Sequence, residues 1–134
     1  MQIEHHRIGG QTLRVGIRHG DTRHPLLLFN GIGANIELIR PLLEALKGPE
    51  FVVFDIPGVG GSPAPILPYR PFMLARLSAR LLDELGHRQV DVLGVSWGGA
   101  VAQHFAAFQR ARCRRLVLVA TATGALMVDR KSVV

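Results

Sequence analysis

The stretch from Val90 to Ala100 constrains the fold of this chain more than any other. A short apolar run of the strand type leads into Gly94-Val95-Ser96-Trp97-Gly98, and a helical pattern over Ala100–Arg110 follows at once. A strand that turns sharply into a helix holds the middle residue in a strained conformation. It also crowds the positions two before and two after, where glycine has no Cβ to clash. We therefore expect the Ser96 hydroxyl to stand free at the carboxyl end of a buried strand.

A serine presented in this way is suited to act as a nucleophile in acyl transfer. The backbone N–H of Trp97 would lie at the start of the following helix, where amides lack intrahelical partners and the helix dipole favours developing negative charge. We therefore predict that Ser96 is the catalytic nucleophile and that the Trp97 N–H is one donor of an oxyanion hole. The alternative is a serine in an ordinary strand–helix turn, which the pentapeptide alone does not exclude.

Apolar strand patterns alternate with helical patterns along the rest of the chain. It opens with a predicted β-hairpin over Ile3–Ile8 and Thr12–Ile17, because Gly9-Gly10 is a two-residue turn signal. Strands are then predicted over 26–29, 51–54, 90–95 and 115–120, helices over 36–47, 72–85 and 100–110, and loops over 20–25, 30–35 and 55–71. Pro41 is expected to break or kink the first helix. This order predicts an α/β fold, in which an antiparallel hairpin leads into a mainly parallel sheet with helices on both faces.

Two glycine-rich loops follow strands of this sheet. Asn30–Asn35 would lie at the same edge as Ser96, because parallel strands share their carboxyl ends. We predict that the Ile32 N–H is the second oxyanion donor, the alternative being a plain glycine turn. Asp55 begins the other loop. A strand-end aspartate is one way to orient a histidine, but we expect Asp55 instead to bind backbone amides and fix its turn.

Motifs for other kinds of site are absent from the sequence. Gly31-x-Gly33 and Gly58-x-Gly60 both lack the third glycine of a dinucleotide fingerprint, and no Gly-Lys-Ser/Thr marks a P-loop. There is no His-Glu-x-x-His, and Cys113 is the single cysteine. We therefore expect no metal, no cofactor and no disulfide framework, and a reducing, cytoplasmic location fits.

The net charge of +6 is carried mostly by arginine, and only Arg110–Arg115 is dense. A solvated turn or helix end is the default explanation of that cluster. Because no interleaved aromatic residues or reading motif accompany it, we expect no nucleic-acid partner; an anionic particle surface stays open. Met1–Gly10 is polar, unlike a secretory leader, and no apolar run approaches the roughly 18 residues of a membrane span. The sequence leaves the oligomeric state undetermined.

A serine hydrolase also needs a base for the hydroxyl proton and an acid to hold that base. The histidines are His5, His6, His19, His24, His87 and His104. None belongs to a loop that is predicted to reach Ser96, and each reads more simply as a surface or satisfied histidine. The base and the acid are therefore expected to lie outside this chain.

Taken together, these residues resemble the α/β-hydrolase family. Within it the chain is most similar to the intracellular medium-chain-length polyhydroxyalkanoate depolymerases, through 29–35, 54–62, 94–100 and 116–124. Asn30 stands where many members of the wider family carry histidine. The resemblance implies hydrolysis of 3-hydroxyacyl esters by a Ser–His–Asp triad without metal or cofactor, on a polyester granule surface or a small ester. It also implies that the acid, the base, the last strands and the cap come later in the family than this chain reaches.

We therefore expect residues 1–128 to be the N-terminal part of one α/β-hydrolase domain. Residues 129–134, Asp-Arg-Lys-Ser-Val-Val, match nothing expected there, whereas they equal the in-frame translation of a common sequencing adapter. We hypothesise that this tail is not native, the alternative being a divergent natural end. Two other functions stay open: a hydrolase of other small esters or carbon–carbon bonds, and a non-catalytic granule-binding remnant.

Overall fold

The sheet of this protein is organised around two parallel strands, β3 and β5, whose ends carry the predicted site. The computed structural model describes residues 1–30, 36–55, 70–119 and 132–133. The strands are β1 (Gln2–Ile8), β2 (Gln11–Arg18), β3 (Asp21–Phe29), β4 (Pro49–Phe54), β5 (Val90–Val95), β6 (Cys113–Val119) and β7 (Ser132–Val133). The helices are α1 (Ile36–Ala45), α2 (Pro71–Leu85) and α3 (Gly98–Phe108). From β1 to β6 this order confirms the predicted one, and β7 is an additional strand that was not predicted.

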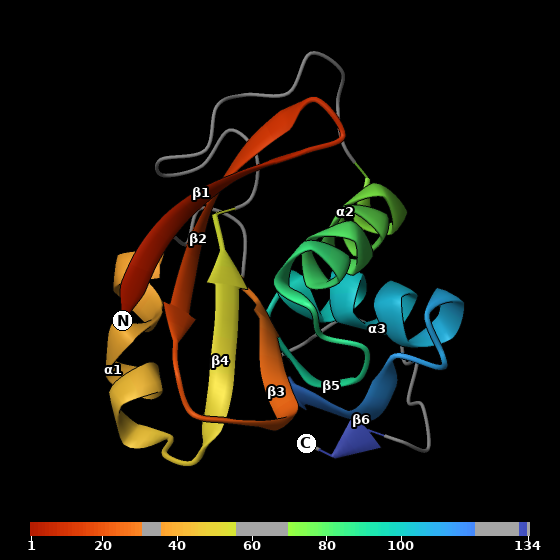
Figure 1. Ribbon diagram of the computed structural model, residues 1–134. Helices are drawn as coiled ribbons and strands as arrows, with labels where there is room; N and C mark the ends of the chain where they lie inside the picture. Colours follow the sequence, from red (N-terminus) through yellow and green to blue (C-terminus); the bar gives the residue numbers. More distant parts are fainter. Residues whose placement is uncertain (31–35, 56–69, 120–131, 134) are drawn as a thin grey trace.

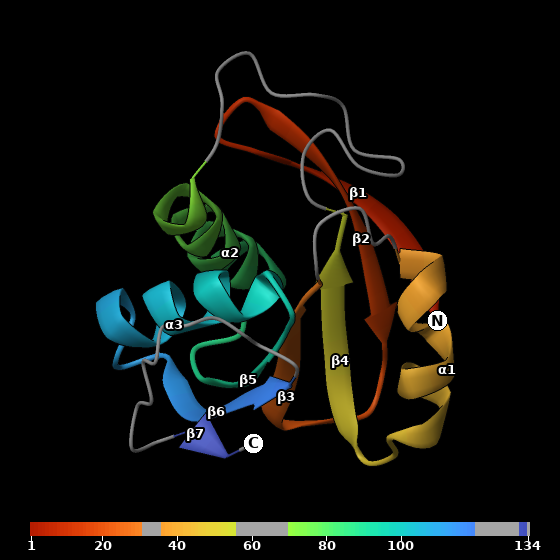
Figure 2. The same ribbon diagram turned by 180° about the vertical axis from the view of Figure 1, so that it is seen from behind.

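Within the described residues the strands form one sheet in the order β1-β2-β4-β3-β5-β6-β7 (Figures 1 and 2). β1 and β2 form the predicted antiparallel hairpin, and Gly9 and Gly10 in its turn both have positive φ. β2 pairs antiparallel with β4, and every later pairing is parallel. The mixed sheet with a mainly parallel body is therefore confirmed.

Alternate residues of the central strands face opposite sides of the sheet, and each side has its own core. On one side Leu27 and Phe29 join the large cluster that includes residues of α2 and α3. On the other side Leu28 joins a smaller cluster with Ile36 and Leu43 of α1. Figures 1 and 2 show α1 on one face and α2 and α3, side by side, on the other. Because both faces are covered, the central strands read as unbroken apolar runs in the sequence.

Several element bounds differ from the prediction, most of them by one or two residues. β3 begins at Asp21 rather than at residue 26, so most of the segment predicted as the loop 20–25 is strand. The polar stretch conceals this, and the pairing shifts register between Asp21 and Leu26. Pro41 lies inside α1, which continues past it to Ala45. Pro71, which fits the first turn of a helix because its missing N–H would be unpaired there, begins α2.

The last described pairing involves the predicted tail. Ser132 and Val133 form a two-residue strand parallel to β6, opposite Leu116 and Val117. A pairing this short does not bear on the origin of residues 129–134, which stays a prediction. None of the helices in the described ranges is both long enough and apolar enough to span a bilayer.

Candidate active site

Ser96 occupies the bend between β5 and α3. Its φ is +56°, and no other non-glycine residue of the described ranges has a positive φ. The Ser96 N–H donates to the Val119 carbonyl at the end of β6 (2.9 Å), and the Ser96 carbonyl accepts from the Gly99 N–H (2.9 Å). The residue itself is exposed. The predicted sharp turn is therefore present. Main-chain hydrogen bonds hold Ser96 in a backbone conformation that residues other than glycine rarely adopt.

The two glycines of the pentapeptide stand where side chains do not fit. A Cβ on Gly94 would lie 2.7 Å from both the Ala102 Cβ and the Gly99 Cα. A Cβ on Gly98 would lie 2.5 Å from the Asn30 carbonyl oxygen. Real Cβ atoms essentially never approach other atoms within 3.0 Å. The spacing of two residues on either side of Ser96 is thus a steric requirement of the bend.

The end of β3 lies beside this bend. Phe29 pairs with Gly94, so Asn30 emerges at the same sheet edge as Ser96. Asn30 is 3% exposed, and within the described part of the chain its side-chain Nδ2 has no hydrogen-bond partner. The prediction that the loop after β3 begins at the serine edge is therefore confirmed at Asn30. Ile32, the predicted second oxyanion donor, lies outside the described residues.

Trp97 connects the bend to the helix. It immediately precedes α3, with φ −60° and ψ −29°, and its carbonyl accepts from the Ala100 N–H (3.0 Å). Its side chain packs against the larger core cluster. The Trp97 backbone therefore lies at the helix start, where a positive dipole end faces outward. No acidic residue occupies the first turn of α3 to offset that field.

Asp55, at the end of β4, is a fully buried carboxylate. Its Oδ1 accepts from the Ile36 N–H (2.9 Å), the first residue of α1, and its Oδ2 accepts from Arg14 Nη1 (3.0 Å). The expectation that Asp55 binds a backbone amide is confirmed for an amide of α1. The turn that Asp55 is predicted to fix lies outside the described residues. The carboxylate thereby satisfies one unpaired donor of the helix end and carries the charge the dipole favours.

Arg14 links this carboxylate to the surface. Its second nitrogen, Nη2, donates to Glu37 Oε2 (2.5 Å), so one guanidinium joins β2, β4 and α1. The hydrogen bond from Arg14 lowers the pKa of Glu37 from 4.5 to about 2, and the two carboxylates raise the pKa of Arg14. Arg14 was not singled out from the sequence, because nothing in a hairpin strand signals a partner 41 residues away.

A histidine is the usual base for a catalytic serine, and this chain has six histidines. His6 bonds Glu4, His19 and His87 both bond Glu50, and the His104 ring stacks on Phe108. His5 lies in β1 and His24 in β3, before its apolar part. In the part of the chain that the structure describes, none of the six hydrogen-bonds Ser96. The same part holds no group of three His, Cys, Asp or Glu residues arranged to bind a metal.

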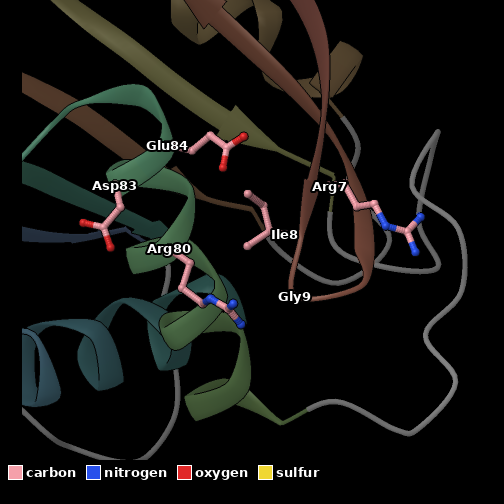
Figure 3. A pocket seen from close by; sticks show the side chains of 6 residues that line it. All are labelled: Arg7, Ile8, Gly9, Arg80, Asp83 and Glu84. Carbon is pink, nitrogen blue, oxygen red and sulfur yellow. The ribbon is translucent and has the colours of Figure 1, made fainter.

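Two charged cavities lie elsewhere and carry no strand-end chemistry. One of about 480 Å³ lies between Gln89 and Arg112, at the amino ends of β5 and β6 and thus at the edge opposite Ser96. The other, of about 350 Å³, lies between the β1–β2 turn and α2. Figure 3 shows Arg80 reaching towards the turn at Gly9 and Asp83 pointing away from it. Neither cavity competes with the Ser96 bend as a reaction site.

Comparison with known proteins gives consistent results. Residues 24–132 match the family model described as alpha/beta hydrolase fold. Over 126 residues the chain is 54% identical to the poly(3-hydroxyalkanoate) depolymerase of Ectopseudomonas oleovorans, covering 92% of this chain and 44% of that protein. It is 34% identical to a 2-hydroxy-6-oxononadienedioate/2-hydroxy-6-oxononatrienedioate hydrolase of Klebsiella pneumoniae, covering 88% and 43%.

A solved structure repeats the same arrangement. The crystal structure of a hydrolase from Pseudomonas aeruginosa PA01 superposes with a TM-score of 0.82 at 29% identity, over 92% of this chain and 48% of that one. The chain thus spans less than half the length of the relatives it matches. The match to the family model and the 54% identity to the depolymerase show that the chain belongs to the alpha/beta hydrolase family.

Proposed function

We propose that the protein to which these residues belong is a serine ester hydrolase that depolymerises poly(3-hydroxyalkanoate), with Ser96 as its nucleophile. The observation that carries this proposal is the exposed Ser96 at φ +56°, between the end of β5 and the start of α3. The strained backbone of Ser96 lowers the stability of the fold. Strain of this kind is typical of functional sites, and here it exposes a hydroxyl group that can react.

The proposed reaction is acyl transfer in two steps. Ser96 Oγ attacks the ester carbonyl carbon and gives its proton to a histidine, while the carbonyl oxygen becomes an oxyanion that accepts from the Trp97 and Ile32 N–H groups. Collapse of the intermediate breaks the ester C–O bond and returns the proton to the departing hydroxyl of the next polymer unit. Water then hydrolyses the acyl-serine by the same route. The proposed reaction uses no metal and no cofactor.

The substrate class rests on the 54% identity to a protein named poly(3-hydroxyalkanoate) depolymerase. In this proposal the histidine base and its orienting acid lie beyond residue 128, and residues 129–134 are not native. The protein is placed in the cytoplasm, at the polyester granule. A clean read of the genomic locus past codon 128 tests the tail. A continuing frame supports the proposal, and a native stop after Val134 contradicts it.

A second candidate is a hydrolase of carbon–carbon bonds in 2-hydroxy-6-oxo acids. The Klebsiella pneumoniae relative, at 34% identity, favours it. Its nucleophile site would be the same, so the two candidates differ in substrate and not in the role of Ser96. Parallel assays with a 3-hydroxyoctanoate oligomer and a 2-hydroxy-6-oxo dienoate separate them, because the proposed function predicts turnover of the oligomer alone.

The proposed function is tested with two proteins. The first is the 134-residue chain, which is expected to hydrolyse p-nitrophenyl octanoate no faster than its Ser96→Ala variant, since it lacks the base. The second is a chimera in which residues 1–128 replace the matching part of the Ectopseudomonas oleovorans depolymerase. This chimera is expected to hydrolyse the oligomer, and its Ser96→Ala variant to lose at least about a thousandfold in rate. A folded, inactive chimera would favour the non-catalytic granule-binding alternative.

A further inference from the structure

The outer surface of α2 and α3 carries three large apolar side chains that are exposed. Phe72 and Met73 in the first turn of α2 are 45% and 37% exposed, and Phe108 at the end of α3 is 72% exposed. Figures 1 and 2 show the two helices side by side on the outside of the sheet. Between them lies a hollow of about 290 Å³, lined by Phe72, Ala75, Arg76, Phe108 and Gln109. Clustered exposed aromatic residues of this kind mark an interaction surface.

Positive charge accompanies this apolar cluster. Arg76 lines the hollow one helical turn after Phe72, and Arg70 and Arg110 lie at the near ends of α2 and α3. None of the three has an acidic partner among the described residues. No aspartate or glutamate occurs between residues 70 and 82 or between residues 98 and 115. The surface is therefore apolar and cationic at once, with no local anion to balance it.

The helix ends make this charge more pronounced. Arg70 is the N-cap of α2, its side chain accepts no hydrogen bond from the backbone N–H groups of the first turn, and no acidic residue follows in that turn. A cation at a helix N-terminus is disfavoured by the dipole. The acidic residues of α2 come at its other end, where Asp83 pairs with Arg112 and Glu84 lies 3.8 Å from His6. The arrangement favours an anionic partner at the Phe72 end of α2.

We propose that Phe72, Met73, Arg76, Phe108 and Arg110, the aromatic–basic surface, dock this protein onto an anionic lipid surface. The aromatic rings enter the boundary between headgroups and acyl chains, and the guanidinium groups pair with lipid phosphates. Charge complementarity selects this occupant, since the chain carries +6 overall and the surface contains no acidic residue. Docking does not depend on the reaction at Ser96, so the two proposals stand or fall separately.

The experiment uses the chimera that joins residues 1–128 to the remaining part of the Ectopseudomonas oleovorans depolymerase, because the 134-residue chain covers only 44% of that relative and the missing part could cover this surface. It measures partition of the chimera onto vesicles of phosphatidylcholine with and without phosphatidylglycerol. Binding is expected only with phosphatidylglycerol and is expected to weaken as salt is raised. Arg76→Gln and Arg110→Gln are each expected to lower the partition coefficient about fivefold. Phe72→Ser with Phe108→Ser is expected to lower it at least about tenfold.

Matched controls change the same residue types elsewhere. Ile3→Ser alters an exposed apolar residue of β1, and Arg88→Gln alters an exposed arginine before β5; both are expected to bind like the parent chimera. Circular dichroism checks that every variant keeps the fold. The proposal is overturned by equal losses in the controls, by equal binding to phosphatidylcholine alone, or by no binding at all. It is also overturned if sedimentation shows that the parent protein is a dimer and that the Phe72 and Phe108 variants are monomers, because the surface then binds a second copy.

Discussion

Gly98, the first residue of α3, packs directly against the main chain of Asn30 at the end of β3. A Cβ placed on Gly98 would lie 2.5 Å from the Asn30 carbonyl oxygen. This contact joins the helix that follows Ser96 to the strand that leads into the predicted oxyanion loop. The start of α3 and the end of β3, which carry the two parts of the proposed site, are therefore in backbone contact. A side chain at position 98 would push these two segments apart.

Gly98→Ala is expected to lower the free energy of unfolding by about 1–3 kcal/mol, because the added methyl group meets backbone atoms that have no room to yield. Urea denaturation monitored by circular dichroism measures the change. Ala107→Ser, at an exposed position of the same helix, is the control and is expected to stay within about 0.5 kcal/mol of the parent. A Gly98→Ala chain as stable as this control would show that the contact is not tight.

Asp55→Ala is expected to destabilise the chain by about 3 kcal/mol, because it leaves the Arg14 guanidinium and the Ile36 N–H without their buried acceptor. Asp55→Asn keeps an acceptor for Ile36 and is expected to cost less. The control is Asp91→Asn, whose partner Arg114 lies nearer solvent, and it is expected to cost under about 1 kcal/mol. Equal costs for Asp55→Ala and Asp91→Asn would contradict the role given to the buried carboxylate.

Glu37→Gln is expected to flatten the acid limb of the stability curve. The pKa of Glu37 is lowered from 4.5 to about 2 by its hydrogen bond with Arg14, so its contribution is present above pH 4.5 and is lost as pH falls towards 2. Because the Glu37 side chain is half exposed, the effect is expected to be below about 1 kcal/mol. Unfolding free energies at pH 6 and at pH 2.5 measure it, and an unchanged difference between them in the variant would contradict it.

Ser96→Gly is expected to raise the free energy of unfolding by about 1 kcal/mol, because glycine adopts a φ of +56° without the Cβ clash that serine meets. Ser96→Ala keeps the Cβ and is expected to leave stability nearly unchanged, which makes it the matched control. Thermal unfolding of the three chains compares them. A glycine variant no more stable than the alanine variant would mean that the bend is not strained.

Most of the fold could be predicted from local patterns in the sequence. The hairpin at Gly9-Gly10, the buried strands and the bend at Ser96 each depend on neighbouring residues, so their spacing reveals them. The start of β3 did not follow from pattern, because its first residues are polar and pair across an irregular register. The ion pair between Arg14 and Asp55 could not be predicted from the sequence either, because β2 and β4 become neighbours only through the order of strands in the sheet. No base could be predicted within this chain, and among the described residues none of the six histidines hydrogen-bonds Ser96.

The most direct test of Ser96 as nucleophile is covalent labelling of the active chimera with a fluorophosphonate, followed by mass spectrometry of its peptides. The account predicts a single adduct on the peptide that contains Ser96, blocked by a 3-hydroxyoctanoate oligomer and absent from the Ser96→Ala variant. An adduct on any other residue, or an active chimera whose Ser96→Ala variant still labels and hydrolyses the oligomer, would contradict it.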